Sequence, residues 1–264
     1  MATIKGIDIA SHQGPNFPFA RARAEGYEFA IIKASGGHRY RNPYRGAQAA
    51  AARAAGMLVG WYHYMFEPTN GGGNMEVEAT NFRDAVLPYC QAGDVPWLDV
   101  EEYPATVGFT GDMGGWIDDW CEMTSDWSRA TTGIYCATWF IDGAGLGRDA
   151  RLTKRPYWMA SWQQEVPAVP FRRPWKEIAI WQYNAFDTVA GVKPIDEDLF
   201  FGGRDEFVAL GIPGTAPAAA DPWAHLKVPY GPLGHTVHPF FHGDYSLEKY
   251  GYPLGPAVAY SDNG

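Results

Sequence analysis

Short runs of apolar residues recur along the chain between Ile4 and Phe200, and they are rich in β-branched and aromatic residues. Runs of this length and composition are typical of buried strands. Longer segments with helical spacing of apolar residues separate the first of these runs, and each is long enough for a crossover between parallel strands. The eight predicted strands are Ile4–Ile9, Phe29–Lys33, Leu58–Tyr64, Val95–Val100, Gly133–Ala137, Tyr157–Ser161, Ile178–Tyr183 and Ile195–Phe200. The predicted helices are Phe17–Glu25, Tyr44–Ala55, Glu76–Val86 and Gly114–Arg129.

This alternation of strands and helices predicts an α/β fold, specifically a (β/α) barrel of the TIM type. The connections before the last three predicted strands are shorter and contain Pro and Gly, so we expect the second half of the barrel to have lost helices. Residues 1–211 form the predicted barrel, and about 210 residues is the low end for this architecture, which agrees with missing helices.

The composition changes after Leu210, because residues 212–264 hold 8 Pro and 7 Gly. Thr215–Pro222 has the sequence of a linker. We therefore predict a domain boundary at this point, followed by a small C-terminal appendage that either packs on the barrel or binds a ligand. Three histidines in it, His235, His238 and His242, have a spacing that would suit zinc, but no helical frame is predicted to hold them, so no metal site is expected.

Charge and apolar content exclude several classes of function. The net charge of −9 repels phosphate backbones, which excludes a nucleic-acid partner. The longest charge-free stretch with an apolar bias, Ala54–Phe66, is too short to span a bilayer, so no membrane insertion is predicted. Met1–Ala10 lacks the apolar stretch and cleavage site of a secretory signal. The 3 cysteines lack metal-ligand spacing and are predicted to be buried thiols made in a reducing compartment.

Acidic residues mark the ends of three predicted strands, which is where barrel enzymes place their catalytic groups. Asp8 lies near the end of the first strand among apolar neighbours, where an unpaired carboxylate is costly. Asp99 and Glu101 end the fourth strand, and their spacing of two puts both side chains on one face. Asp196 and Asp198 repeat this pattern at the eighth strand, which a closed barrel places beside the first.

Clustered carboxylates repel one another, so the pKa of one rises and it stays protonated near neutral pH while another is ionised. Glycoside hydrolysis needs an acid that protonates the leaving oxygen and a carboxylate that stabilises positive charge at the anomeric carbon or directs the nucleophile. A single Asp-x-Glu motif is also typical of a solvated strand end or a salt bridge, but three acidic sets at one barrel mouth favour catalysis. The 11 Trp, 15 Tyr and 14 Phe suit a sugar cleft, although aromatic residues also fill cores.

Seven segments follow one another in a specific order and spacing. They are Gly6-Ile-Asp-Ile-Ala-Ser-His-Gln-Gly, Phe29-Ala-Ile-Ile-Lys-Ala-Ser-Gly-Gly, Gly60-Trp-Tyr-His-Tyr, Trp97-Leu-Asp-Val-Glu, Tyr157-Trp-Met-Ala-Ser-Trp, Trp181-Gln-Tyr and Asp196-Glu-Asp-Leu-Phe-Phe-Gly. Together they resemble the glycoside hydrolase family 25 lysozymes, the Chalaropsis-type muramidases. The similarity extends from Lys5 to about Asp205.

The resemblance implies a flattened barrel of eight strands with a reduced helix set and no cofactor or metal. It implies cleavage of the β-1,4 bond between N-acetylmuramic acid and N-acetylglucosamine in peptidoglycan. By position, Glu101 would be the general acid, and Asp99 would stabilise the developing charge or orient the 2-acetamido group. Asp8 and Asp196 would tune those pKa values and position water or sugar.

Two positions depart from the pattern of the family, because Ala10 stands where Ser is common and Asp198 where Asn is common. The extra negative charge of Asp198 either raises the pKa of Glu101 or shares the role of Asp196. Lys33, in an apolar strand, needs a carboxylate partner that the mouth cluster could supply. For the aromatic candidates, packing in the core is the alternative. The residues predicted to bind substrate are Tyr62, Tyr135, Trp162, Gln182, Tyr183, Lys33 and Asp198.

Two other function classes compete with a muramidase. The first is a non-catalytic glycan-binding barrel, which the retention of all four catalytic carboxylates disfavours. The second is another N-acetylhexosaminidase-type glycosidase, such as a chitinase-like enzyme, whose longer Asp-x-x-Asp-x-Asp-x-Glu motif is incomplete in Asp94–Glu101. Without a visible signal peptide we expect a monomeric phage endolysin made in the host cytoplasm and released to the wall, or alternatively a secreted enzyme. The appendage is then a candidate wall-binding segment.

Overall fold

The computed structural model describes residues 2–162, 174–214, 228–230 and 235–237. The chain divides into two compact units, Met1–Pro217 and Ala218–Gly264. In the second unit, β10 (Val228–Tyr230) pairs in antiparallel fashion with β11 (His235–Val237). The predicted linker at Thr215–Pro222, together with His238 and His242, lies outside the described residues.

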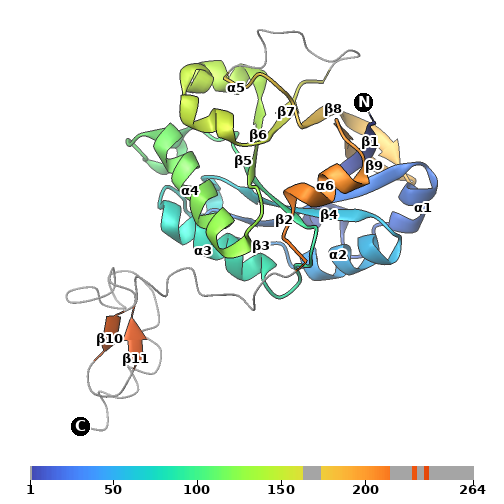
Figure 1. Ribbon diagram of the computed structural model, residues 1–264, viewed down its shortest axis with the longest axis horizontal. Helices are drawn as coiled ribbons and strands as arrows, with labels where there is room; N and C mark the ends of the chain where they lie inside the picture. Colours follow the sequence, from blue (N-terminus) through green and yellow to red (C-terminus); the bar gives the residue numbers. More distant parts are fainter. Residues whose placement is uncertain (1, 163–173, 215–227, 231–234, 238–264) are drawn as a thin grey trace. The chain divides into compact units, whose positions relative to one another are not determined.

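Eight strands of the first unit close into a barrel (Figure 1). Around the barrel the strand order is β1, β9, β8, β7, β6, β5, β4 and β2, and a β1–β2 pairing completes the circle. The strands are β1 (Ile4–Ile9), β2 (Tyr27–Gly36), β4 (Leu58–Tyr64), β5 (Val95–Asp99), β6 (Gly133–Ala137), β7 (Tyr157–Ala160), β8 (Ile180–Val189) and β9 (Val192–Phe200). A two-residue strand, β3 (Tyr40–Arg41), pairs with the end of β2. The predicted eight-stranded barrel is confirmed.

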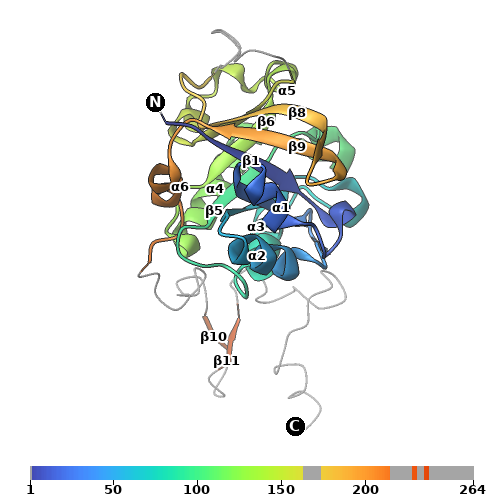
Figure 2. The same ribbon diagram turned by 90° about the vertical axis from the view of Figure 1, so that its right-hand side faces the viewer.

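The last strand of the barrel runs in the opposite direction to the others. The first seven barrel strands pair in parallel, whereas β9 is antiparallel to both β8 and β1 (Figure 2). Ala190 and Gly191, with φ of 55° and 82°, form the two-residue turn between β8 and β9, which leaves no room for a crossover helix. The expectation that Asp196 and Asp198 lie at a carboxyl end is therefore wrong: β9 enters the sheet from the mouth.

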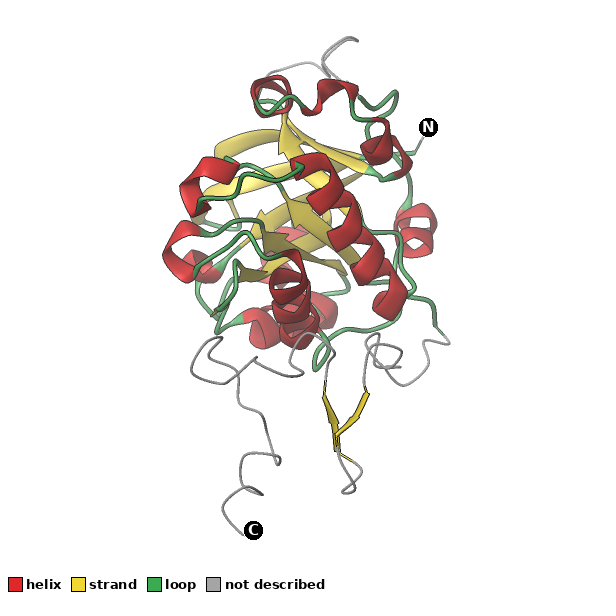
Figure 3. Ribbon diagram, turned by 90° about the vertical axis from the view of Figure 1, so that its left-hand side faces the viewer, coloured by secondary structure: helices red, strands yellow, loops and turns green. Residues whose placement is uncertain are grey.

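The four predicted helices are present with boundaries shifted by one or two residues. They are α1 (Phe19–Ala24), α2 (Arg45–Ala54), α3 (Met75–Val86) and α4 (Met113–Ser128), and they lie outside the sheet (Figure 3). The Asn74 and Asp112 side chains cap α3 and α4 by accepting hydrogen bonds from Val77 N and Gly115 N, both 3.1 Å. Two further helices, α5 (Thr138–Gly143) and α6 (Arg204–Leu210), are short, so the reduced helix set is also confirmed.

Large aromatic side chains fill the barrel below its mouth. The Trp158 ring packs edge-on against Trp97, Tyr62 and Tyr135, with centroid distances of 5.6, 6.3 and 4.7 Å. Gly133 makes this packing possible, because a Cβ there would lie 2.1 Å from the Trp97 ring. These four residues form an aromatic layer beneath the polar groups of the mouth. The cysteines are free thiols; Cys121 and Cys136 are buried and Cys90 is half-buried.

Candidate active site

The barrel brings the four predicted catalytic carboxylates to its mouth. Asp8 and Asp196 are cross-strand partners on β1 and β9. Asp99 is the last residue of β5, and Glu101 follows two residues later. The Asp99 side chain is almost completely enclosed, whereas Glu101 is only half-buried. Of the β5 pair, Glu101 is therefore the group that a bound ligand can reach more easily.

Burial dominates the electrostatics of these groups. It raises the pKa of Asp99, which the neighbouring Glu101 raises further while Lys33 lowers it. It also raises the pKa of Glu101, opposed by Lys33 and reinforced by Glu102 and Asp196. Burial brings the pKa of Asp196 to about 6. Since two adjacent carboxyl groups do not both ionise readily, the Asp99–Glu101 pair keeps its last proton to a higher pH than an isolated carboxyl group does.

A hydrogen-bonded chain orients Asp8. Gln182 Nε2 donates to Asp8 Oδ2 at 2.8 Å. Gln182 Oε1 accepts from the Tyr135 hydroxyl at 3.0 Å and from Trp162 Nε1 at 3.1 Å. Because both of these neighbours donate, the amide oxygen of Gln182 must face them and its NH₂ group must face Asp8. Three of the predicted substrate-binding residues thus form one network with a catalytic carboxylate.

Asp198 lies beneath this network, and its side chain is fully buried. Its Oδ1 accepts a hydrogen bond from Trp158 Nε1 at 2.8 Å, and its carboxyl group contacts that of Asp8. Asp198 Oδ2 has no donor among the described N–H and O–H groups. Two carboxyl oxygens form a hydrogen bond only when one of them carries a proton. Through this contact Asp198 positions Asp8 from below. Because Asp198 is fully buried, it is shielded from contact with a sugar.

Tyr62 and Tyr183 have different surroundings. Tyr62 lies among Asp8, Asp99 and Glu101, and burial, together with these charges, raises the pKa of its hydroxyl. Tyr183 follows Gln182 on β8 and therefore points to the opposite face of the strand. Its hydroxyl donates to Glu197 Oε1 at 3.0 Å. The structure thus places Tyr62 in the mouth and Tyr183 outside the barrel wall.

Lys33 has a carboxylate partner outside the predicted cluster. Its Nζ lies 3.5 Å from Glu67 Oε2 and 4.3 Å from the centroid of the Tyr64 ring. The Tyr64 hydroxyl donates to Glu102 Oε1 at 3.0 Å. The sequence analysis missed Glu67 and Glu102. Both lie in loops that directly follow barrel strands, and this position was the signal that could have identified them.

A buried relay supports the loop that carries Glu67. Ser35 Oγ lies 2.8 Å from His63 Nδ1, and His63 Nε2 lies 3.0 Å from Glu78 Oε2. Glu78 also accepts from the backbone N–H groups of Phe66 and Gly73 at 3.1 and 2.8 Å. All three relay side chains are completely buried, and burial lowers the pKa of His63. The relay is inaccessible to any substrate, so its role is to hold the loop after β4.

Replacing Lys33 by Met is expected to shift the pH–activity profile to higher pH. The ammonium group lowers the pKa of both Asp99 and Glu101, so its removal raises both. A general acid then stays protonated to higher pH, and its partner ionises later, so both limbs move in the same direction. Initial rates between pH 4 and 9 test this. Lys33→Arg keeps the charge and should leave the profile in place; an unchanged Lys33→Met profile would contradict the assignment.

No group of three or more His, Cys, Asp or Glu side chains within the described residues could hold a metal ion. In the same part of the chain, no helix is long and apolar enough to cross a membrane.

Comparisons with known proteins identify the family of this barrel. The family model for glycosyl hydrolases family 25 matches residues 7–192. Lysozyme M1 of Streptomyces globisporus is 29% identical over 221 residues, covering 78% of this chain and 71% of the relative. The lysozyme structure from Streptomyces coelicolor has a TM-score of 0.65 at 24% identity, covering 80% of this chain and 98% of its own. A muramidase structure from Acremonium alcalophilum has a TM-score of 0.65 at 27% identity, with 78% and 98% covered.

The barrel and its acidic mouth therefore define a glycoside hydrolase. The chain belongs to glycosyl hydrolases family 25.

Proposed function

We propose that this glycoside hydrolase is a lysozyme, which cleaves the β-1,4 bond between N-acetylmuramic acid and N-acetylglucosamine in peptidoglycan. The observation that carries the proposal is the half-buried Glu101 beside the enclosed Asp99 at the barrel mouth, with pKa values raised by burial. The names of its relatives, lysozyme M1 and muramidase, support the same substrate.

In the proposed reaction, the carboxylic acid of Glu101 donates its proton to the glycosidic oxygen as the bond from that oxygen to the anomeric carbon breaks. The negative charge of Asp99 stabilises the positive charge that develops on the sugar ring. Asp99 Oδ1 is buried and accepts no hydrogen bond from the described residues, so no neighbouring donor neutralises the charge of this carboxylate. Water then adds to the anomeric carbon and gives up a proton to a carboxylate of the mouth, and the Glu101 acid is regenerated as hydrolysis is completed.

Asp8 and Asp196 support this pair from the other side of the mouth. The negative charge of Asp196 raises the pKa of Glu101. Asp8 is held in one orientation by Gln182 and is enclosed as completely as Asp99. We assign Asp8 and Asp196 the positioning of water or sugar and the maintenance of the proton on Glu101.

Digestion of purified peptidoglycan tests the proposal directly. The products are reduced with borohydride, and mass spectrometry then identifies the sugar at each new reducing end. We expect reduced muramic acid ends. Reduced glucosamine ends would instead make the protein a glucosaminidase on the same scaffold. If walls of several chemotypes release no soluble fragments, the glycan-binding alternative replaces the enzyme.

A further inference from the structure

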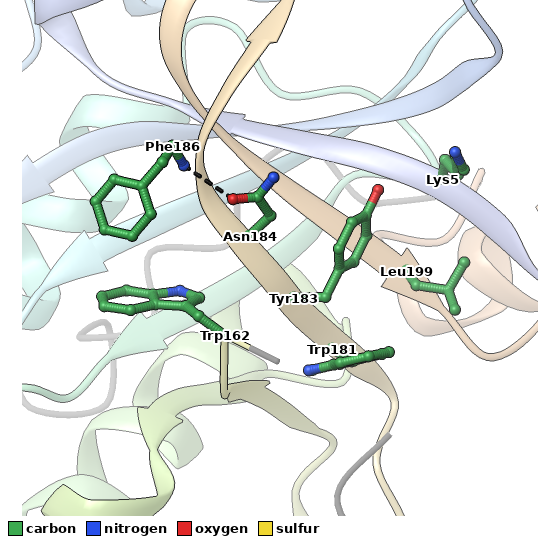
Figure 4. Close-up of a pocket in the computed structure, with 7 residues that line it drawn as sticks. All are labelled: Lys5, Trp162, Trp181, Tyr183, Asn184, Phe186 and Leu199. Atoms are coloured by element: carbon green, nitrogen blue, oxygen red, sulfur yellow. Dashed lines mark hydrogen bonds between the residues drawn. The ribbon is translucent and has the colours of Figure 1, made fainter. Parts of the chain in front are cut away.

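A pocket of about 630 Å³ lies beside the mouth on the outer surface of the barrel (Figure 4). It lies along β8, on the strand pair whose tight turn leaves no crossover helix. Two of its aromatic residues are highly exposed: Trp162 at 56% and Phe186 at 62%. The residues that line the pocket are Lys5, Trp162, Trp181, Tyr183, Asn184, Phe186 and Leu199.

Each polar aromatic ring of the pocket has its polar atom bound within the protein. Trp162 Nε1 donates to Gln182 Oε1 at 3.1 Å, and Trp181 Nε1 donates to the Ser161 carbonyl at 2.7 Å. The Tyr183 hydroxyl donates to Glu197. The rings are therefore held in place before any ligand arrives, and a ligand meets ring faces and edges. Binding to such a surface costs little side-chain entropy.

Buried Glu197 fixes the other wall of the pocket. Its Oε2 accepts from Asn184 Nδ2 at 2.9 Å, and the hydroxyl of Tyr27 also donates to this carboxylate. Asn184 Oδ1 in turn accepts from the backbone N–H of Phe186 at 3.1 Å (Figure 4). The β8–β9 pairing is irregular at Asn184, with register shifts on both sides. These bulges orient the Phe186 ring edge-on to Trp162, with centroids 5.5 Å apart.

We propose that this pocket is a second glycan-binding site, which holds sugar units of a wall polysaccharide outside the catalytic mouth. The inference rests on the proposed function. Ordered aromatic rings with a few polar groups between them match pyranose rings, which have apolar C–H faces and hydroxyl edges. Lys5 is the one cation among the lining residues and suits the free carboxylates of the stem peptides that muramic acid carries.

Trp162 links the pocket to the catalytic site by a hydrogen bond. The indole of this residue lines the pocket, while its N–H group bonds to the same Gln182 oxygen that orients the amide toward Asp8. A glycan strand that leaves the mouth over Trp162 therefore meets Phe186 next. The chain has a net charge of −9 and gains no overall attraction to anionic walls, so local contacts of this kind must supply affinity for an extended polymer.

Phe186→Ala provides the test, because this side chain is exposed and lies outside the catalytic network. We expect unchanged turnover of a soluble tetrasaccharide from the wall, which is short enough to occupy only the mouth. Binding to intact sacculi, measured by sedimentation in the inactive Glu101→Gln background, should weaken by about three- to tenfold. Leu87→Ala, which truncates an exposed apolar residue after α3, is the matched control and should bind like the parent.

Each other outcome is informative. Sacculus binding equal to that of the parent overturns the second site. Loss of tetrasaccharide turnover together with binding also overturns it, because the pocket then belongs to the catalytic groove. If the wild type releases no fragments but Phe186→Ala still weakens binding to sacculi, the second site stands and the proposed hydrolytic function fails. Thermal melting of Phe186→Ala, expected to match the parent, excludes a folding defect as the cause.

Discussion

Glu101→Gln is expected to slow the release of soluble fragments from peptidoglycan by about a hundred- to ten-thousand-fold, the range over which general acids act. Glutamine has the same shape but cannot donate a proton to the glycosidic oxygen. The side chain is half-buried and glutamine occupies the same space, so we expect the fold to be preserved. Rates of fragment release at the pH optimum, with sedimentation on sacculi as the binding readout, measure the effect.

Glu102→Gln is the matched control for this substitution. It makes the same chemical change one residue later, at a group that contacts the Tyr64 hydroxyl and raises the pKa of Glu101 only through its charge. We expect its rate to fall within a few-fold of the wild type. If Glu101→Gln retained more than a tenth of the activity, Glu101 would not be the proton donor.

Asp198→Asn is expected to stabilise the protein at neutral and alkaline pH. Burial, reinforced by Asp196 and Glu197, raises the pKa of Asp198 well above its usual range, although the Trp158 N–H group opposes the rise. The folded protein thus keeps a proton that the unfolded chain releases above about pH 4. Such a group makes its full contribution to the free energy of unfolding at pH values below the pKa that it has in the unfolded chain. This contribution is lost as the pH rises through the pKa that the group has in the folded protein.

Asparagine removes this loss because it does not titrate. Its carbonyl oxygen can still accept from Trp158, and its NH₂ group can donate to Asp8 at the position where two carboxyl groups meet in the wild type. The expected gain at pH 8 is a rise of several °C in Tm, since about 1 kcal/mol of added stability raises the Tm of a domain of this size by about 2–4 °C. The gain should disappear toward pH 4, where both residues are uncharged.

Thermal melts of the wild type and Asp198→Asn between pH 4 and 8 measure this difference. Asp126→Asn, at an exposed position on α4, is the control and should follow the wild type at every pH. A difference in Tm that is the same at pH 4 and pH 8, or a less stable variant at pH 8, would show that Asp198 does not carry the proton that we assign to it.

The sequence predicted most of the barrel because its elements are locally determined. The strand runs and the four crossover helices follow from apolar periodicity, and their boundaries agree with the structure within three residues, except that β8 continues six residues beyond the predicted end at Tyr183. The direction of β9 was not predicted, because the turn depends on positive φ at Ala190 as well as Gly191. Alanine rarely adopts this conformation, so the two-residue Ala-Gly sequence is a weak hairpin signal.

How deeply each side chain is buried also could not be predicted from local sequence patterns. Tyr183 and Gln182 are neighbours on one strand, yet one faces the outer pocket and the other the mouth. Asp196 and Asp198 share a face of β9, but only Asp198 lies directly over Trp158 and is fully buried. Strand alternation gives two faces, and the residues on neighbouring strands decide which face is covered.

The sequence by itself determined the eight strands, the main helices and the presence of Asp8, Asp99, Glu101 and Asp196 in or next to barrel strands, because periodicity and residue chemistry are properties of short stretches. Only the tertiary structure decided that Glu67 pairs with Lys33, that Asp198 supports Asp8 from below, and that an aromatic pocket opens beside the mouth. These features depend on distances between residues far apart in the chain. Burial and charge interactions, which set each pKa, follow from those distances.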